Sequence, residues 1–191
     1  MGWVALRAIA AATCAVSLLV SAPATAQDLS ALDRGVAAYA SGNYAVALAQ
    51  FRLAAAQGEA RAQFTLGTMY KNGEGVPQNY VEAVTWYRLA AAQGVAVAQT
   101  ALGSMYYLGT GVPQNHAEAM KWFHLAAAQG FAGAQNNLGV MHRNGEGVPQ
   151  NYAEAVKWFR LAAAQGHAGA QSNLGVMHRN GEGVPQNYVE A

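Results

Sequence analysis

Apolar residues recur at helical spacing along most of this chain, in two kinds of segment that alternate. In the first kind, represented by residues 80–93, they follow the i, i+3, i+4, i+7 pattern of a helix with one buried face. These positions are Tyr80, Ala83, Val84, Tyr87 and Ala91. Trp86 and Leu89 project off that face. A helix that is apolar on two sides needs two neighbours, so we expect it to pack between its own partner and the next unit.

The second kind of segment, residues 96–108, predicts another helix, with a buried stripe of its own. That stripe is Ala98, Leu102, Met105 and Tyr106. Turn chemistry marks where the helices begin and end. Asn79 can cap a helix whose third residue is Glu82, and Gly94 suits the left-handed residue that ends it. The sequence therefore predicts pairs of antiparallel helices of ordinary length.

The two segments recur together with a period of 36 residues. The four full units are residues 43–78, 79–114, 115–150 and 151–186. A truncated fifth unit occupies residues 187–191. Small residues, such as the alanines 90–92 facing Gly103, favour close approach of the helices. A fixed period of this size is typical of stacked units, each too small to bury its own apolar face. The predicted fold is all-α, a solenoid of 36-residue helix-turn-helix repeats.

A motif runs through the units in the order AxxWYxxAAxxG, AxxxLGxxY and GxGV. In the third unit its residues are Ala119, Trp122, Phe123, Ala126, Ala127, Gly130, Ala134, Leu138, Gly139, Gly145, Gly147 and Val148. The motif resembles the Sel-like repeat (SLR), a relative of the tetratricopeptide repeat, from residue 43 to the C-terminus. The resemblance implies a right-handed α-solenoid that serves as a protein-binding scaffold. Two features depart from the family: Tyr70 and Tyr106 become His142 and His178, and the cysteine pairs of disulfide-rich secreted members are absent.

The N-terminal residues predict export. Residues 1–26 combine one charge, Arg7, with an apolar run and an A-x-A site, which is typical of a bacterial Sec signal peptide cleaved after Ala26. The apolar run is too short to span a membrane, so we expect a periplasmic or secreted protein without stable membrane insertion. Residues 27–42 predict an N-terminal capping helix, with Leu32, Val36 and Tyr39 at helical spacing and Asp28, Asp33 and Arg34 on a polar outer face. No matching cap follows residue 186, so we expect the C-terminal end to be unstable as given.

The charge of the chain bears on which partners it can bind, and its cysteine content bears on how it is stabilised. Without Arg7 the chain holds ten basic and ten acidic side chains, and without residues 1–26 it has no cysteine. A neutral surface gives no reason to expect nucleic acid or an anionic membrane as partner. The exported chain would be stable through helical packing alone, without disulfides.

The sequence contains no recognisable catalytic or metal-binding motif. No zincin, P-loop, nucleophile-elbow or S-x-x-K motif occurs. His142 and His178 occupy equivalent places in adjacent repeats, but stacked helices lie about 8–10 Å apart, too far for one shared zinc. We therefore expect no catalytic residue, metal or cofactor. Some secreted relatives are linked with β-lactam binding, so a protein that binds or hydrolyses β-lactam or cell-wall ligands is the alternative function.

A mostly basic row predicts where a ligand binds. Opposite the buried stripe of each first helix lie Arg52, Arg88, Lys121, His124, Lys157 and Arg160. The basic side chains predict an extended, acidic or carboxylate-bearing segment of a protein or peptide as the ligand. The resemblance adds weight, because in tetratricopeptide relatives this face lines the concave groove. The alternative is a solvated helix face on which Lys121 and Lys157 pair with Glu118 and Glu154. Trp122, on the flank of the same helix, is expected to face the next repeat.

Overall fold

The computed structural model describes residues 29–187, and within this range the chain consists of helices joined by turns and loops. They are α1 (Ala31–Ala40), α2 (Tyr44–Ala56), α3 (Ala60–Asn72), α4 (Tyr80–Ala92), α5 (Ala96–Leu108), α6 (His116–Ala128), α7 (Ala132–Asn144), α8 (Tyr152–Ala163) and α9 (Ala168–Asn180). The predicted signal peptide, residues 27–28 at the start of the predicted capping helix, and residues 188–191 of the truncated fifth unit lie outside the described residues.

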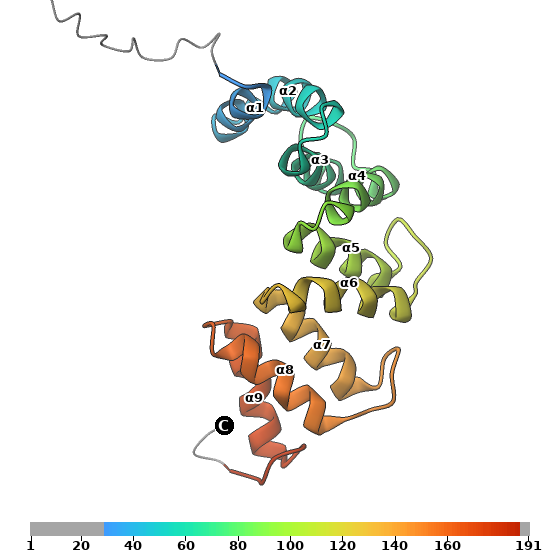
Figure 1. Cartoon of the computed structure of the whole chain (residues 1–191), viewed down its shortest axis with the longest axis vertical. Coiled ribbons are helices and arrows are strands. Elements are labelled where there is room, and N and C mark those ends of the chain that lie inside the picture. The colour runs from blue at the N-terminus through green and yellow to red at the C-terminus, as the bar shows by residue number, and fades with distance from the viewer. Residues whose placement is uncertain (1–28, 188–191) are drawn as a thin grey trace, which may run out of the picture.

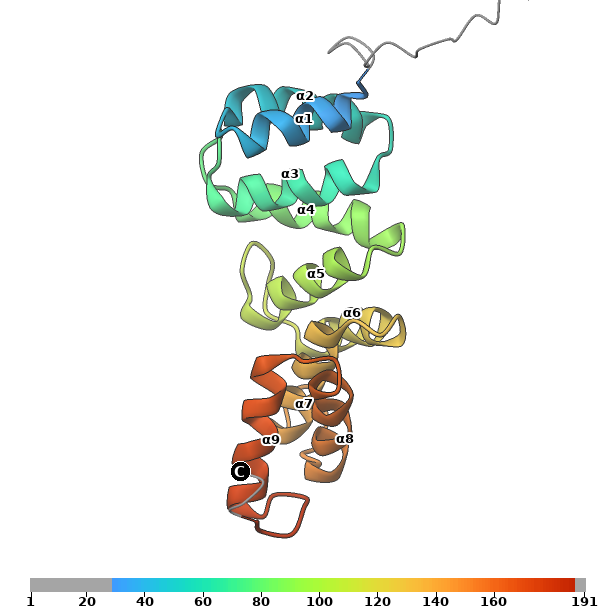
Figure 2. The ribbon, with the colours of Figure 1, turned by 90° about the vertical axis from the view of Figure 1, so that its left-hand side faces the viewer.

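The helices stack along one long axis, with α1 and α2 at one end and α9 at the other (Figures 1 and 2). Contact is most extensive in the pairs α1–α2, α3–α4, α5–α6 and α7–α8. Consecutive pairs are joined by the packing of α2 on α3, α4 on α5, α6 on α7 and α8 on α9. The predicted all-α repeat solenoid is confirmed. None of the helices between residues 29 and 187 has the length and apolar character needed to cross a membrane.

The helix boundaries follow the predicted turn chemistry. The side chain of Asn79 accepts hydrogen bonds from the backbone N–H groups of Val81 and Glu82, both at 3.1 Å. Gly94 follows α4 with φ +86°, a conformation that only glycine adopts at little cost. Both α4 and α5 are 13 residues long, within one residue of the expected lengths.

The core lies in separate clusters, each built mainly from neighbouring helices. In the α4–α5 cluster, Val84, Tyr87 and Leu102 are buried as predicted. Leu89, however, is 45% exposed, so the prediction that it packs on a neighbour is wrong. Trp86 does pack on a neighbour, the cluster formed by α1, α2 and α3.

Trp122 faces the preceding repeat, not the next one as expected. It is half-buried and packs against the α4–α5 cluster. The fully buried aromatic of α6 is instead its neighbour Phe123, which is 1% exposed. The two side chains are one residue, or about 100°, apart around the helix, so only one of them can occupy the central position.

Glycines on one helix receive the buried aromatic rings of the next. A Cβ atom at Gly103 would lie 2.7 Å from the Phe123 ring, closer than real Cβ atoms approach. Gly103 of α5 therefore faces α6 of its own pair, and the expectation that it faces the alanines 90–92 of α4 is wrong. The same fit recurs along the solenoid as Gly35–Phe51, Gly67–Tyr87, Gly103–Phe123 and Gly139–Phe159.

Buried glutamines form hydrogen bonds both within and between the pairs, which the sequence did not predict. The amide of Gln99, 4% exposed, donates to the Ala91 carbonyl at 3.2 Å, and its oxygen accepts from Gln129 at 2.9 Å. Gln63 and Gln135 accept equivalent bonds from Gln93 and Gln165 at 2.8 Å. These hydrogen bonds offset the cost of burying the amides, which would be destabilising without partners.

The N-terminal helix α1 packs on α2 as α3 packs on α4. Leu32 and Tyr39 are partly buried, as expected, but Val36 is 37% exposed. The small Gly35 is buried in its place, since Phe51 needs the space above it. Arg34 is not purely an outer-face residue, because its Nε donates to Gln50 of α2 at 3.0 Å.

Candidate functional site

The structure places the six residues of the predicted ligand row on the even-numbered helices. Arg52 lies on α2, Arg88 on α4, Lys121 and His124 on α6, and Lys157 and Arg160 on α8, and all six are exposed. Arg52, Arg88, His124 and Arg160 occupy equivalent positions, 36 residues apart. We call these four residues the arginine row.

The first two arginines of the row are held by tyrosines of the following helix. Arg52 Nη2 donates to the Tyr70 hydroxyl at 2.7 Å, and its guanidinium lies 6.0 Å from the centre of that ring. Arg88 Nη2 donates to the Tyr106 hydroxyl at 3.0 Å. These contacts fix the direction of each side chain and use one of its five N–H donors, so the guanidinium can still bind a carboxylate.

The lysines are paired within their own helices. Lys121 Nζ lies 2.5 Å from the Glu118 carboxylate, and Lys157 Nζ lies 2.5 Å from that of Glu154. The hydrogen bond from Lys157 lowers the pKa of Glu154, so this carboxylate stays charged. These are the ion pairs expected of a solvated helix face. The two lysines therefore offer a ligand less positive charge than the arginines do.

His124 is the member of the arginine row that has no permanent positive charge. Its ring meets the Trp158 ring edge-on, with 5.7 Å between the centres. Partial desolvation of the ring, and then the neighbouring His142, lower the pKa of His124, which favours the neutral form of its imidazole. Among residues 29–187, no group of three or more His, Cys, Asp or Glu side chains is arranged to hold a metal ion.

An exposed leucine follows each member of the arginine row. Leu53, Leu89, Leu125 and Leu161 are 48%, 45%, 50% and 51% exposed. They occur at the same position in every unit, which the sequence shows plainly, but the helical pattern assigned Leu89 to a buried flank. Each unit therefore presents a guanidinium or imidazole next to an apolar side chain.

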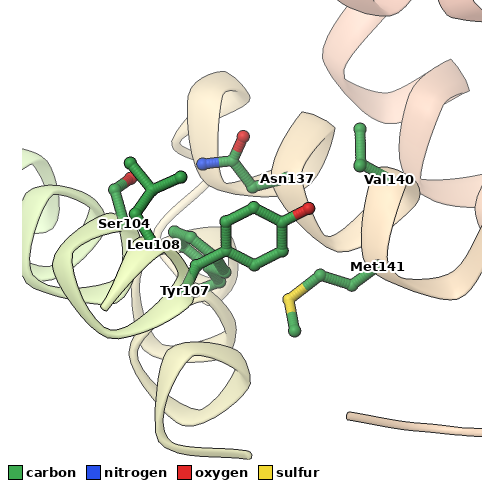
Figure 3. A pocket seen from close by; sticks show the side chains of 7 residues that line it. Ser104, Tyr107, Leu108, Asn137, Val140 and Met141 are labelled. Atoms are coloured by element: carbon green, nitrogen blue, oxygen red, sulfur yellow. The ribbon is translucent and has the colours of Figure 1, made fainter. Parts of the chain in front are cut away.

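Two cavities lie between successive odd-numbered helices. One, of about 210 Å³, is lined by Ser104, Tyr107 and Leu108 of α5, by Phe123 of α6, and by Asn137, Val140 and Met141 of α7. Figure 3 shows the labelled side chains of α5 and α7 around it. The other, of about 250 Å³, occupies the equivalent place between α3 and α5. The Ser104 hydroxyl, which lines both, donates to the Thr100 carbonyl at 2.9 Å, as is usual for a serine within a helix. Sequence reasoning placed no ligand here.

The profile of the Sel1 repeat family matches residues 60–95, 96–131, 132–167 and 168–191. This chain belongs to the Sel1 repeat family. Its match begins at α3, whereas the units counted from residue 43 begin one helix earlier, at α2. In the frame of the Sel1 repeat, the cavities lie between the first helices of successive repeats, and the arginine row lies on the second helices. A ligand along that row stays a prediction.

Solved Sel1 repeat structures share the fold. The c5321 protective antigen of uropathogenic Escherichia coli strains, which displays an SLR fold, superposes with a TM-score of 0.78 at 42% identity, over 82% of this chain and 34% of its own. A Sel1 repeat protein from Oxalobacter formigenes gives 0.74 at 36% identity, over 82% of this chain and 64% of its own. The chain thus spans about a third of the length of the Escherichia coli protein and just under two thirds of the length of the Oxalobacter formigenes protein. No curated protein matches it.

Proposed function

We propose that this Sel1 repeat chain is an exported, non-catalytic scaffold that binds an extended acidic segment of a partner protein along the arginine row. The family fold generally supports protein interaction. The observation that carries the proposal is the exposed pairing of a cationic and an apolar side chain, repeated at Arg52–Leu53, Arg88–Leu89 and Arg160–Leu161. Neither member of a pair is used by the core, so the pairs are available to a partner.

The chemistry of these pairs suits a segment with alternating acidic and apolar residues. A guanidinium binds a carboxylate through two parallel hydrogen bonds, which a lysine cannot do. The tyrosine contacts of Arg52 and Arg88 order the side chains before binding, which reduces the entropy lost when a ligand binds. Four exposed leucines supply apolar area that a partner would remove from water.

Changing Arg52, Arg88 and Arg160 together to alanine is expected to weaken partner capture by about tenfold or more, since each charge-assisted hydrogen bond contributes strongly. The fold should persist, because all three side chains are exposed. The measurement is quantitative recovery of envelope proteins on the immobilised parent and variant chains, with circular dichroism to verify folding.

The matched control changes Arg61 and Arg179, which are exposed on odd-numbered helices, to alanine. This variant removes positive charge but leaves the row intact, so it should capture the same proteins as the parent. Equal losses in both variants would show that net charge matters rather than the row, and full retention in the triple variant would place the ligand elsewhere.

Export is the second part of the proposal and depends on the A-x-A site that ends at Ala26. We expect the mature protein to begin at Gln27. Mass spectrometry of the protein recovered from the periplasm or medium should find that terminus. A mature form that retains Met1 would contradict cleavage.

A further inference from the structure

Polar contacts tie α1, α5 and α7 each to the loop that follows the next odd-numbered helix, and we call the place where such a helix meets such a loop a joint. The Tyr39 hydroxyl of α1 donates to Glu74 at 2.7 Å, and the Tyr107 hydroxyl of α5 donates to Glu146 at 2.6 Å. The hydrogen bond to Glu74, followed by burial, raises the pKa of Tyr39 to about 12, so this hydroxyl keeps its proton and remains a donor. At the last such joint, Arg143 Nε of α7 forms a salt bridge with Glu182 at 2.9 Å. Three joints therefore contain a loop carboxylate.

The joint between α3 and α5 has the donor but lacks the carboxylate. The helix position is Lys71, and the loop position that holds Glu74, Glu146 and Glu182 in the other units holds Thr110. Within residues 29–187, the Lys71 ammonium group forms no salt bridge or hydrogen bond. The nearby Glu74 is already occupied, since one of its carboxylate oxygens accepts from Tyr39 and the other from Asn72 at 2.9 Å.

A cavity of about 250 Å³ lies at this joint and is lined by both Lys71 and Thr110. Its other walls are mainly apolar or aromatic: Tyr80, Tyr87, Ala101, Ser104, Met105 and Leu108. Cavities for drug-sized ligands are about 300–1,000 Å³, so this one suits a single amino-acid side chain. The methylene groups of an inserted side chain would contact Met105 and Leu108 while its end reached Lys71.

We propose that this cavity binds a glutamate side chain of a partner segment, whose carboxylate pairs with Lys71 in the place left by Thr110. The partner glutamate thus completes the joint as Glu182 completes the one at Arg143. The lining of the site comes from α3, α4, α5 and the loop after α5 and includes no member of the arginine row, so the site adds a second contact for the acidic segment. It rests on the proposed function only for the source of that segment.

The test needs no partner protein, so its failure would leave the proposed function standing. Acetyl-glutamate amide and its neutral analogue acetyl-glutamine amide are titrated into the ¹⁵N-labelled protein. Probes of this size have dissociation constants of about 1 mM or weaker. We expect the acid to shift the amide signals of Lys71, Ser104 and Thr110, and the neutral analogue to bind at least about tenfold more weakly. Equal binding of the two probes, or shifts confined to the arginine row, would overturn the proposal.

Variants at Lys71 and Thr110 test whether charge or shape determines binding of the acid. Lys71→Gln should weaken binding of the acid about tenfold, whereas Lys121→Gln, which removes a lysine outside the cavity, should leave it unchanged. Thr110→Glu should abolish binding of the acid and raise the melting temperature, because its own carboxylate would pair with Lys71. Thr110→Gln, which is of equal size but neutral, should have a smaller effect on both quantities. An equal effect of Glu and Gln at position 110 would contradict the role of charge. Acetyl-leucine, with a terminal carboxylate, should bind more weakly than acetyl-glutamate amide; tighter binding would contradict a side-chain ligand.

Discussion

Replacing Phe123 by alanine is expected to lower the free energy of unfolding by about 3–5 kcal/mol, the range for removing a buried large aromatic side chain. Phe123 is 1% exposed and fills the space above Gly103, so alanine would leave a cavity between α5 and α6. Each pair of helices in a solenoid depends on its neighbours, so the loss should reach both flanking repeats. Urea unfolding followed by circular dichroism measures it.

Trp122→Ala is the matched control, one residue away on the same helix. Trp122 is larger but only half-buried, so its removal should destabilise the protein by less than about 3 kcal/mol. From sequence, Trp122 was placed on the flank that faces the next repeat, and no order between the two rings was predicted. If Trp122→Ala destabilised the protein more than Phe123→Ala, the positions assigned to these two rings would be wrong.

The sequence predicted the helices well because their boundaries depend on local chemistry. Asn79 caps α4 through its own side chain, and Gly94 adopts its left-handed conformation wherever the helix is placed. Neither feature needs information from another repeat. The same is true of the period, which the repeated prolines and glycines display directly.

The neighbour of each aromatic side chain could not be predicted in the same way. The pattern placed Tyr87, the equivalent of Phe123, on the buried stripe and Trp86, the equivalent of Trp122, off it, but it did not show which repeat the tryptophan faces. The packing of Phe123 likewise depends on Gly103, which lies 20 residues earlier on α5 and leaves room for one ring. That information belongs to the packing of two helices rather than to either helix alone.

The candidate site was only partly predictable for a related reason. The sequence identified the exposed residues of the arginine row, but a periodic sequence has no unique starting point. Counting from residue 43 or from residue 60 gives the same period and exchanges the first and second helix of every unit. Contacts between helices, such as Arg52 of α2 with Tyr70 of α3, and the cavity beside Lys71 depend on how the helices stack.

Gly75→Ala is expected to destabilise the protein by about 2–5 kcal/mol, because two separate effects combine at this position. Gly75 has φ +72°, which a Cβ atom disfavours by about 1–2 kcal/mol. A Cβ atom would also lie 2.8 Å from the carbonyl oxygen of Tyr44 in α2. That atom is backbone and cannot rotate away, so the loop would have to move from α2, at about 1–3 kcal/mol more.

Gly58→Ala isolates the first effect, since Gly58 has φ +88° and no atom within 4 Å of the Cβ position. It should destabilise the protein by about 1–2 kcal/mol, from backbone strain alone. The difference between the two variants, measured by urea unfolding, therefore reports the close approach of the Gly75 loop to the start of α2. Equal losses would mean that contact between this loop and α2 contributes nothing to stability. In that case the second glycine of the GxGV motif would serve only the shape of its own loop.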